Sequence, residues 1–125
     1  MQVLQMRPYE QVVLDQDRLN ALYCEMGAAA AEDIVCRAME ELAQRLTRCD
    51  SQYHAADMKG LRKNTRSLVA IADQVGMFTL SKVASDVTAC IDRQDDVALA
   101  ATLSRLIRIG ERSLTAVWDL HDVPI

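Results

Sequence analysis

The sequence predicts an all-α protein, an antiparallel up-down-up-down four-helix bundle with a short N-terminal cap helix. Apolar residues recur at three- and four-residue steps along most of the chain, and no segment alternates as a strand does. The apolar residues are mainly aliphatic, and aromatic residues make up only 4% of the chain. The two prolines, Pro8 and Pro124, lie near the ends, so none interrupts a helix between them.

Two helices are expected in the first half of the chain. The first is short and ends at Gly27, and either Asp15 or Asp17 can cap its N-terminus. The second covers about 28–53 without a helix-breaking residue. Its expected core positions are Ile34, Val35, Ala38, Leu42, Leu46, Cys49 and Tyr53.

The third helix is expected over 58–75. Asp57 is its expected N-cap, and Gly76 ends it. Its positions have two opposite characters when they are placed 100° apart. The core side carries Leu61, Thr65, Leu68, Ala72 and Val75.

Two more helices complete the expected bundle. One runs to about residue 92 with Thr79 or Ser81 as its cap, and the last covers about 97–120 after the polar turn 93–96. Gly110 lies on the buried side of the last helix, which predicts a close approach to a neighbour. The expected core positions are Leu80, Val83, Val87, Cys90 or Ile91, Leu99, Leu103, Leu106, Leu114 and Val117.

Length and charge set bounds on domain organisation and partners. At 125 residues we expect one helical domain over 14–121, preceded by an arm or short extra helix over 1–13. The net charge of −4 argues against general nucleic-acid binding, which requires a cationic footprint. We expect no membrane association, because no apolar run approaches the length of a membrane span. The segment 1–13 lacks the apolar stretch of a signal peptide, so we expect a cytoplasmic protein.

The four cysteines, at positions 24, 36, 49 and 90, form no Cys-x-x-Cys pair, and no histidine lies at metal-ligand spacing. We therefore expect free, reduced thiols, no metal site and no cofactor. The sequence also lacks a glycine-rich phosphate loop and other catalytic motifs, so we expect no enzymatic activity.

The face of the 58–75 helix opposite its core side is cationic. Lys59, Arg62, Lys63 and Arg66 gather there, and we call these four residues the cationic face. Ala70 follows them, Val69 lies at the flank, and Asp73 is the first acid on that side.

This helix resembles the signature helix of the histidine phosphotransfer (Hpt) domains of bacterial phosphorelays. That signature runs roughly Ala-His-x-Leu-Lys-Gly-(Ser/Ala), followed by a Leu-Gly pair. Leu68 and the Val75-Gly76 pair fit its spacing, whereas Arg66 occupies the position of the phosphorylated histidine. Val69 and Ala70 occupy the positions of the lysine and the glycine.

The resemblance extends over about 13–120. The family typically opens with a Leu-Asp-x-x-x-Leu stretch before a short helix and a glycine, and this chain has Leu14-Asp15-Gln-Asp-Arg-Leu19 before Gly27. The segment 93–99 is similar to the family's gap before its last helix. The resemblance implies a helical bundle and a role in two-component signalling.

An arginine at position 66 changes what this scaffold can do. Its guanidinium stays protonated and cannot act as a phosphoryl acceptor, so the expected protein is phosphorylation-incompetent. It can instead bind the acidic phosphorylation pocket of a receiver domain in a response regulator or hybrid kinase. Because the family also docks through the neighbouring helix, further contacts are expected at its edge, from Met77, Phe78, Ser81, Lys82 and Ser85.

Three alternatives remain open. The cationic face could be an ordinary solvated surface with ion pairs to Asp57, Asp73 or Asp86. Phosphotransfer could proceed through a non-standard residue such as His54, since His54 and His121 are the only histidines. A helical scaffold or dimerisation module, or an adaptor for an unrelated partner, would use the same fold. The polar exposed faces favour a monomer over a dimer.

Overall fold

The computed structural model describes residues 12–121, and it describes side chains for residues 12–117. This part of the chain is all-helical. Its helices are α1 (Gln16–Met26), α2 (Ala28–His54), α3 (Met58–Gln74), α4 (Phe78–Asp92) and α5 (Asp96–His121). The expected arm at 1–13 lies mostly outside the described residues, as do residues 122–125. No described helix combines the length and the apolar character that crossing a membrane requires.

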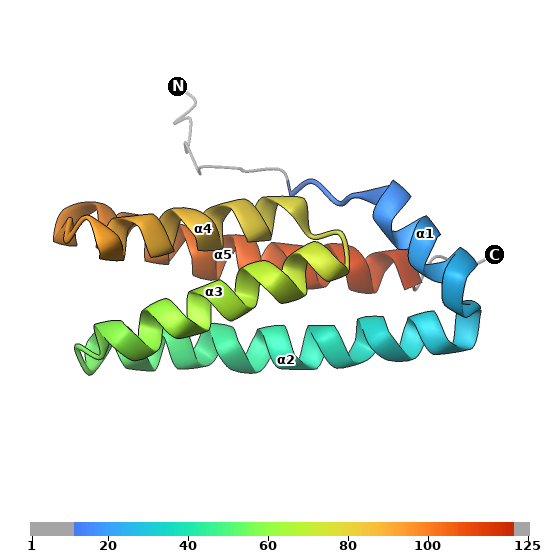
Figure 1. Cartoon of the computed structure of the whole chain (residues 1–125), viewed down its shortest axis with the longest axis horizontal. Coiled ribbons are helices and arrows are strands. Elements are labelled where there is room, and N and C mark those ends of the chain that lie inside the picture. Colours follow the sequence, from blue (N-terminus) through green and yellow to red (C-terminus); the bar gives the residue numbers. More distant parts are fainter. Residues whose placement is uncertain (1–11, 122–125) are drawn as a thin grey trace, which may run out of the picture.

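Each of the four long helices contacts two of the others, so that together they form a ring. α2 contacts α3 and α5, and α4 also contacts α3 and α5. Figure 1 shows α2, α4 and α5 along the long axis of the molecule, α3 inclined between α2 and α4, and α1 across one end. The arrangement is compatible with a helical bundle.

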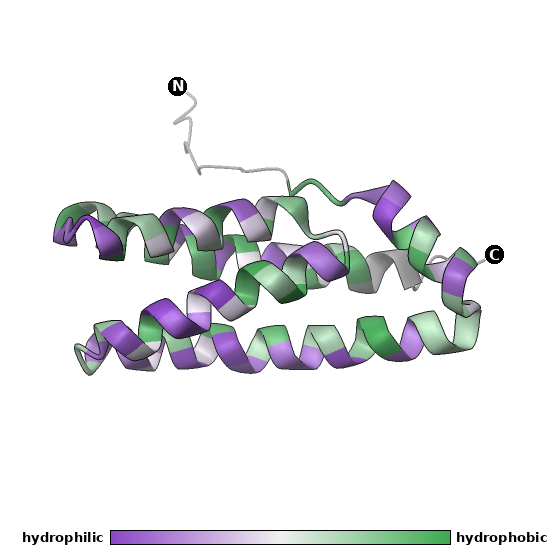
Figure 2. Ribbon diagram, viewed as in Figure 1, coloured by the Kyte–Doolittle hydropathy of each residue, from purple (hydrophilic) through white to green (hydrophobic). Residues whose placement is uncertain are grey.

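Each helix contributes one apolar side to a shared core. Figure 2 shows hydrophilic and hydrophobic residues alternating around the helices, as expected for amphipathic elements. The expected core side of α3 is confirmed, since all five of its residues are buried. Ile91 and Leu114 are only half-buried, so Cys90 rather than Ile91 is the core position at the end of α4.

The helix ends agree with the caps expected from the sequence. Asp15 accepts a hydrogen bond from the N–H of Arg18 and begins α1, and Asp57 accepts one from the N–H of Gly60 and begins α3. Gly27 and Gly76 end α1 and α3 with φ of 80° and 76°. These positive φ values favour glycine.

The prediction that Thr79 or Ser81 caps α4 is wrong. α4 begins after Met77 without a side-chain cap, and the Thr79 hydroxyl accepts a hydrogen bond from the N–H of Val13 at 2.7 Å. Leu14 and Met77 form an isolated antiparallel β-bridge, and the N–H of Asp15 donates to the Gly76 carbonyl at 2.6 Å. The segment before α1 therefore supplies polar partners to the connection between α3 and α4.

Candidate functional site

The cationic face lies on the outer side of α3, but its four residues do not have equal surroundings. Lys59, Lys63 and Arg66 are exposed, and none forms an ion pair with another described residue. Arg62 is half-buried and pairs with Asp92 at the end of α4. Three cations therefore remain for a partner, with Arg66 in the middle of the helix.

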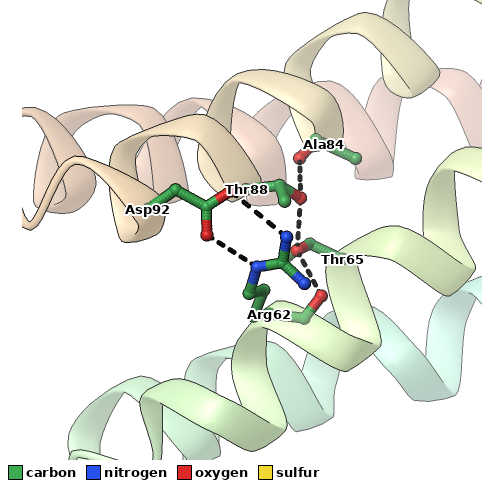
Figure 3. Close-up of polar contacts among 5 residues, drawn as sticks. All are labelled: Arg62, Thr65, Ala84, Thr88 and Asp92. Atoms are coloured by element: carbon green, nitrogen blue, oxygen red, sulfur yellow. Dashed lines mark hydrogen bonds and ion pairs between the residues drawn. The ribbon is translucent and has the colours of Figure 1, made fainter.

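The pair of Arg62 and Asp92 joins α3 to α4 through two parallel hydrogen bonds. Arg62 Nε donates to Asp92 Oδ1 at 2.6 Å, and Nη2 donates to Oδ2 at 3.2 Å (Figure 3). These bonds hold the pKa of the Asp92 carboxyl below its ordinary value, and the charge of Arg66 lowers this pKa further. They also raise the pKa of Arg62. The alternative of an ordinary solvated surface named Asp57, Asp73 and Asp86 as possible partners, and Asp92 is none of these.

A second polar contact between α3 and α4 lies one helical turn away. The hydroxyls of Thr65 and Thr88 are 2.8 Å apart, and each also lies within hydrogen-bond distance of a carbonyl in its own helix (Figure 3). Each hydroxyl has one proton, so one of them donates to the other, and the accepting hydroxyl donates its own proton to the carbonyl in its helix. Together with Arg62 and Asp92, this contact fixes the register of α3 against α4.

Asn64 holds α3 against α2 on its other side. Its side chain is buried and donates to the Arg45 carbonyl and to Gln52 Oε1, while Arg45 Nη1 donates back to Asn64 Oδ1 at 3.0 Å. No buried side-chain nitrogen or oxygen among the described residues lacks a partner. Because α3 is held on both sides, its rotation is set and the cationic face points away from the core.

The other expected contact residues divide into exposed and buried groups. Ala70, Asp73 and Lys82 are exposed, Phe78 is 59% exposed, and Val69 is half-buried against the core. Ser85 is also exposed. Met77 and Ser81 are buried, so the expectation that they line an interface edge is wrong. Met77 is buried because it lies at the corner where Leu14 bridges to it.

His54 is the last residue of α2, before the turn that leads to α3. Its side chain is 72% exposed, and its Nε2 lies 3.4 Å from Asp50 Oδ1. The four cysteines are free: Cys24 and Cys36 are exposed, whereas Cys49 and Cys90 are buried. Among residues 12–121, no group of three or more histidine, cysteine or acidic side chains could hold a metal ion.

Sequence reasoning missed two residues that position this site, Asp92 and Asn64. Asp92 and Arg62 lie almost equally far from the corner at Gly76 and Met77, as Thr65 and Thr88 do. Folding α3 and α4 into an antiparallel hairpin about this corner would have brought these pairs together. Asn64 lies next to the core residue Thr65, and its polar side chain among buried positions was the available signal.

Comparisons with protein-family models, with curated proteins and with solved structures found no match to this chain.

Proposed function

We propose that this chain is an Hpt-type protein of two-component phosphorelay signalling that docks on a receiver domain without transferring phosphate. The observation that carries the proposal is the state of Arg66. It is exposed in the middle of α3 and has no ion pair among the described residues, at the position where the resemblance puts the phosphorylated histidine.

The chemistry of Arg66 suits binding better than catalysis. A guanidinium remains protonated at physiological pH, so it offers no lone pair for an attack on phosphorus. It can donate paired hydrogen bonds to carboxylates, which line the phosphorylation pocket of a receiver domain. In this proposal the protein is not an enzyme, requires no cofactor, and works in the cytoplasm, where it competes with true phosphotransfer proteins.

The proposal includes the topology of an antiparallel up-down-up-down four-helix bundle, with α1 as its cap. Contacts between successive helices support it, because each joins residues placed almost evenly about a connection. Asn64 meets Arg45 across the connection of α2 and α3, and Arg105 meets Asp86 across that of α4 and α5. Such placement is expected when each helix reverses the direction of the one before it.

A binding titration tests the proposal. The purified protein is titrated with receiver domains from its own genome, and the Arg66→Glu variant is titrated in parallel. Because a carboxylate facing an acidic pocket is repelled, we expect saturable binding by the wild type and its loss in the variant. Circular dichroism checks that the variant keeps its helices.

Arg48→Glu is a matched control. Arg48 is an exposed arginine of α2 without an ion pair to the described residues, so its replacement makes the same charge change outside the cationic face. Equal losses in both variants would point to a general effect of charge and contradict docking through α3. An affinity of Arg66→Glu for the receiver domain equal to that of the wild type would also contradict the proposal.

A phosphorylation assay separates docking from phosphotransfer. A phosphorylated receiver is mixed with the wild type, with His54→Ala and with Arg66→His. We expect no labelling of the wild type, whereas label in the wild type that His54→Ala removes would establish His54 as an acceptor. Labelling of Arg66→His alone would support the correspondence of position 66 with the family's histidine.

A further inference from the structure

A pocket lies at the end of the molecule where α3 begins, α4 ends and α5 begins. Its volume is about 630 Å³, larger than the two hollows between α2 and α5, which measure about 450 and 440 Å³. The side chains that matter for its chemistry are Met58, Lys59, Arg62, Ile91, Asp96 and Leu99.

The pocket combines an apolar interior with a cationic wall. Leu99 is buried, and Met58 and Ile91 are half-buried, so each keeps part of its surface in the core. Lys59 and Arg62 line the pocket and are also members of the cationic face. The pocket is thus continuous with the surface that the proposed function uses.

The ion pair with Asp92 favours one orientation of the Arg62 side chain in this wall. Nε and Nη2 of Arg62 are both bound to the Asp92 carboxylate, which restricts the orientation of the whole side chain. A pocket whose wall is already ordered loses less conformational entropy when a ligand enters it. Lys59, in contrast, has no ion pair with a described residue and is available to an acid of the partner.

We propose that this pocket takes one large apolar side chain from the receiver domain, at the edge of the acidic surface that meets Lys59, Lys63 and Arg66. This inference rests on the proposed function and names the anchor of that interface. An apolar anchor in a pocket supplies much of the binding energy in many interfaces, and the surrounding charges set association rate and specificity.

The hollow of about 450 Å³ between α2 and α5 is lined by more acids than suit the same acidic partner. Asp50 and Glu111 line it together with His54 and Arg108. An acidic surface would meet two carboxylates and one arginine there, whereas the proposed pocket presents one carboxylate, Asp96, together with Lys59 and Arg62. Like charges in an interface oppose association. This hollow therefore serves as the reference site in the experiment.

Two isoleucines provide matched reporters. Ile91 lines the proposed pocket and Ile107 lines the hollow between α2 and α5, and both are half-buried. The wild-type protein, labelled at its isoleucine methyl groups, is titrated with the receiver domain that binds it, and methyl NMR spectra are recorded. We expect the Ile91 signal to shift with saturation and the Ile107 signal to stay in place.

Affinity measurements on Ile91→Ala and Ile107→Ala complete the test. Loss of an anchor contact weakens binding by about tenfold or more, so we expect such a loss for Ile91→Ala and less than about a twofold change for Ile107→Ala. The NMR titration needs no variant, so it decides the matter even if Ile91→Ala proves unstable.

The outcomes distinguish the pocket from the docking surface. The receiver could bind Arg66→Glu more weakly and yet leave the Ile91 signal in place and bind Ile91→Ala as tightly as the wild type. That result would overturn the proposed role of the pocket and leave docking through the cationic face standing. A shift of Ile107 instead of Ile91 would also overturn the pocket. Failure of the wild type to bind any receiver would overturn both.

Discussion

Arg62 and Arg66 carry the same charge on the same side of α3 but have different partners. Arg62 is bound through two hydrogen bonds to Asp92, whereas Arg66 forms no ion pair with a described residue. A partner that recruits Arg62 must first displace an intramolecular carboxylate, while Arg66 is available at no such cost. The difference makes Arg66, rather than Arg62, the arginine of the cationic face that is available to an acidic partner.

The bond between Arg62 and Asp92 makes stability depend on pH. Because the bond holds the pKa of Asp92 below its ordinary value of 3.8, the ionised carboxylate stabilises the fold. This contribution is complete well above that value and is lost as the pH falls through the lowered pKa of the folded state. We expect Asp92→Asn to be less stable than the wild type near neutral pH and equally stable in strong acid, as measured by urea unfolding.

Asp73→Asn is the control for this comparison. Asp73 is an exposed acid of α3 that forms no ion pair with the described residues, so Asp73→Asn makes the same change of charge without removing an ion pair. A stability difference for Asp92→Asn that persists unchanged in strong acid would show that the lost contact is not the ionic one.

The four cysteines should differ sharply in reactivity. Burial raises the pKa of the Cys49 thiol to about 11, so the reactive thiolate is scarce at neutral pH, and the thiol is also shielded from reagents. We expect a maleimide to label Cys24 and Cys36 in the folded protein and all four cysteines after denaturation, counted by mass spectrometry. Labelling of Cys49 or Cys90 as fast as Cys24 would contradict the burial described here.

At the scale of the helix, Gly110 of α5 packs closely against Leu46 of α2. A methyl group at this position would overlap Leu46 Cδ1 and lie 2.9 Å from Cδ2. Leu46 is buried but also lines the hollow of about 440 Å³ between α2 and α5, so its side chain would have to rotate toward that hollow to make room. The expectation of a close helix approach at Gly110 is therefore confirmed.

Gly110→Ala tests this approach. The overlap should cost about 1–3 kcal/mol, while the better helix propensity of alanine returns about 1 kcal/mol, so we expect a net loss of about 1 kcal/mol. In a Leu46→Ala background the overlap is absent, and the same change should stabilise the protein by up to about 1 kcal/mol. Thermal or urea unfolding of the four variants of this cycle gives the answer, and a loss of equal size in both backgrounds would contradict it.

Helix positions could be predicted well because their signals are local. Asp15 and Asp57 cap the helices that follow them, and Gly27 and Gly76 supply the positive φ at the ends. The prediction for the cap of α4 was wrong because a distant segment intervenes: the N–H of Val13 donates a hydrogen bond to the Thr79 hydroxyl. No pattern within α4 carries that information.

The cationic face could be predicted, but its partners within the fold could not. Exposure of Lys59, Lys63 and Arg66 follows from helical periodicity alone. The pairing of Arg62 with Asp92 depends on the register of two helices, and residues thirty positions apart meet only once that register is set. The half of the site that depends on a single helix follows from the sequence pattern directly, whereas the half that depends on packing follows only once α3 is folded against α4 about the corner at Gly76 and Met77.

At the scale of the whole molecule, a local concentration of positive charge lies on a chain with a net charge of −4. An acidic partner is repelled by the molecule as a whole and attracted by one surface, so the field orients the encounter. Salt screens both effects over about 10 Å at moderate ionic strength.

This balance predicts how receiver binding responds to salt. We expect association to slow by about tenfold between low and high ionic strength, with a smaller change in the dissociation rate, because steering acts on the encounter. Stopped-flow or surface-based kinetics across a salt series measure both rates. An association rate that does not depend on salt would show that the cationic face does not guide the encounter.

The bridge of Leu14 to Met77 has a consequence for the order of folding. Val13 and Thr79, which flank it, are 66 positions apart, so the chain must close a long loop before the Asp15 N–H reaches the Gly76 carbonyl. Contacts of such separation tend to form after the local helices and hairpins. We expect the bridge to form late in folding and to break before the helices separate. The Asp15 amide should therefore exchange with deuterium faster than the amides in the middle of α3 and α4.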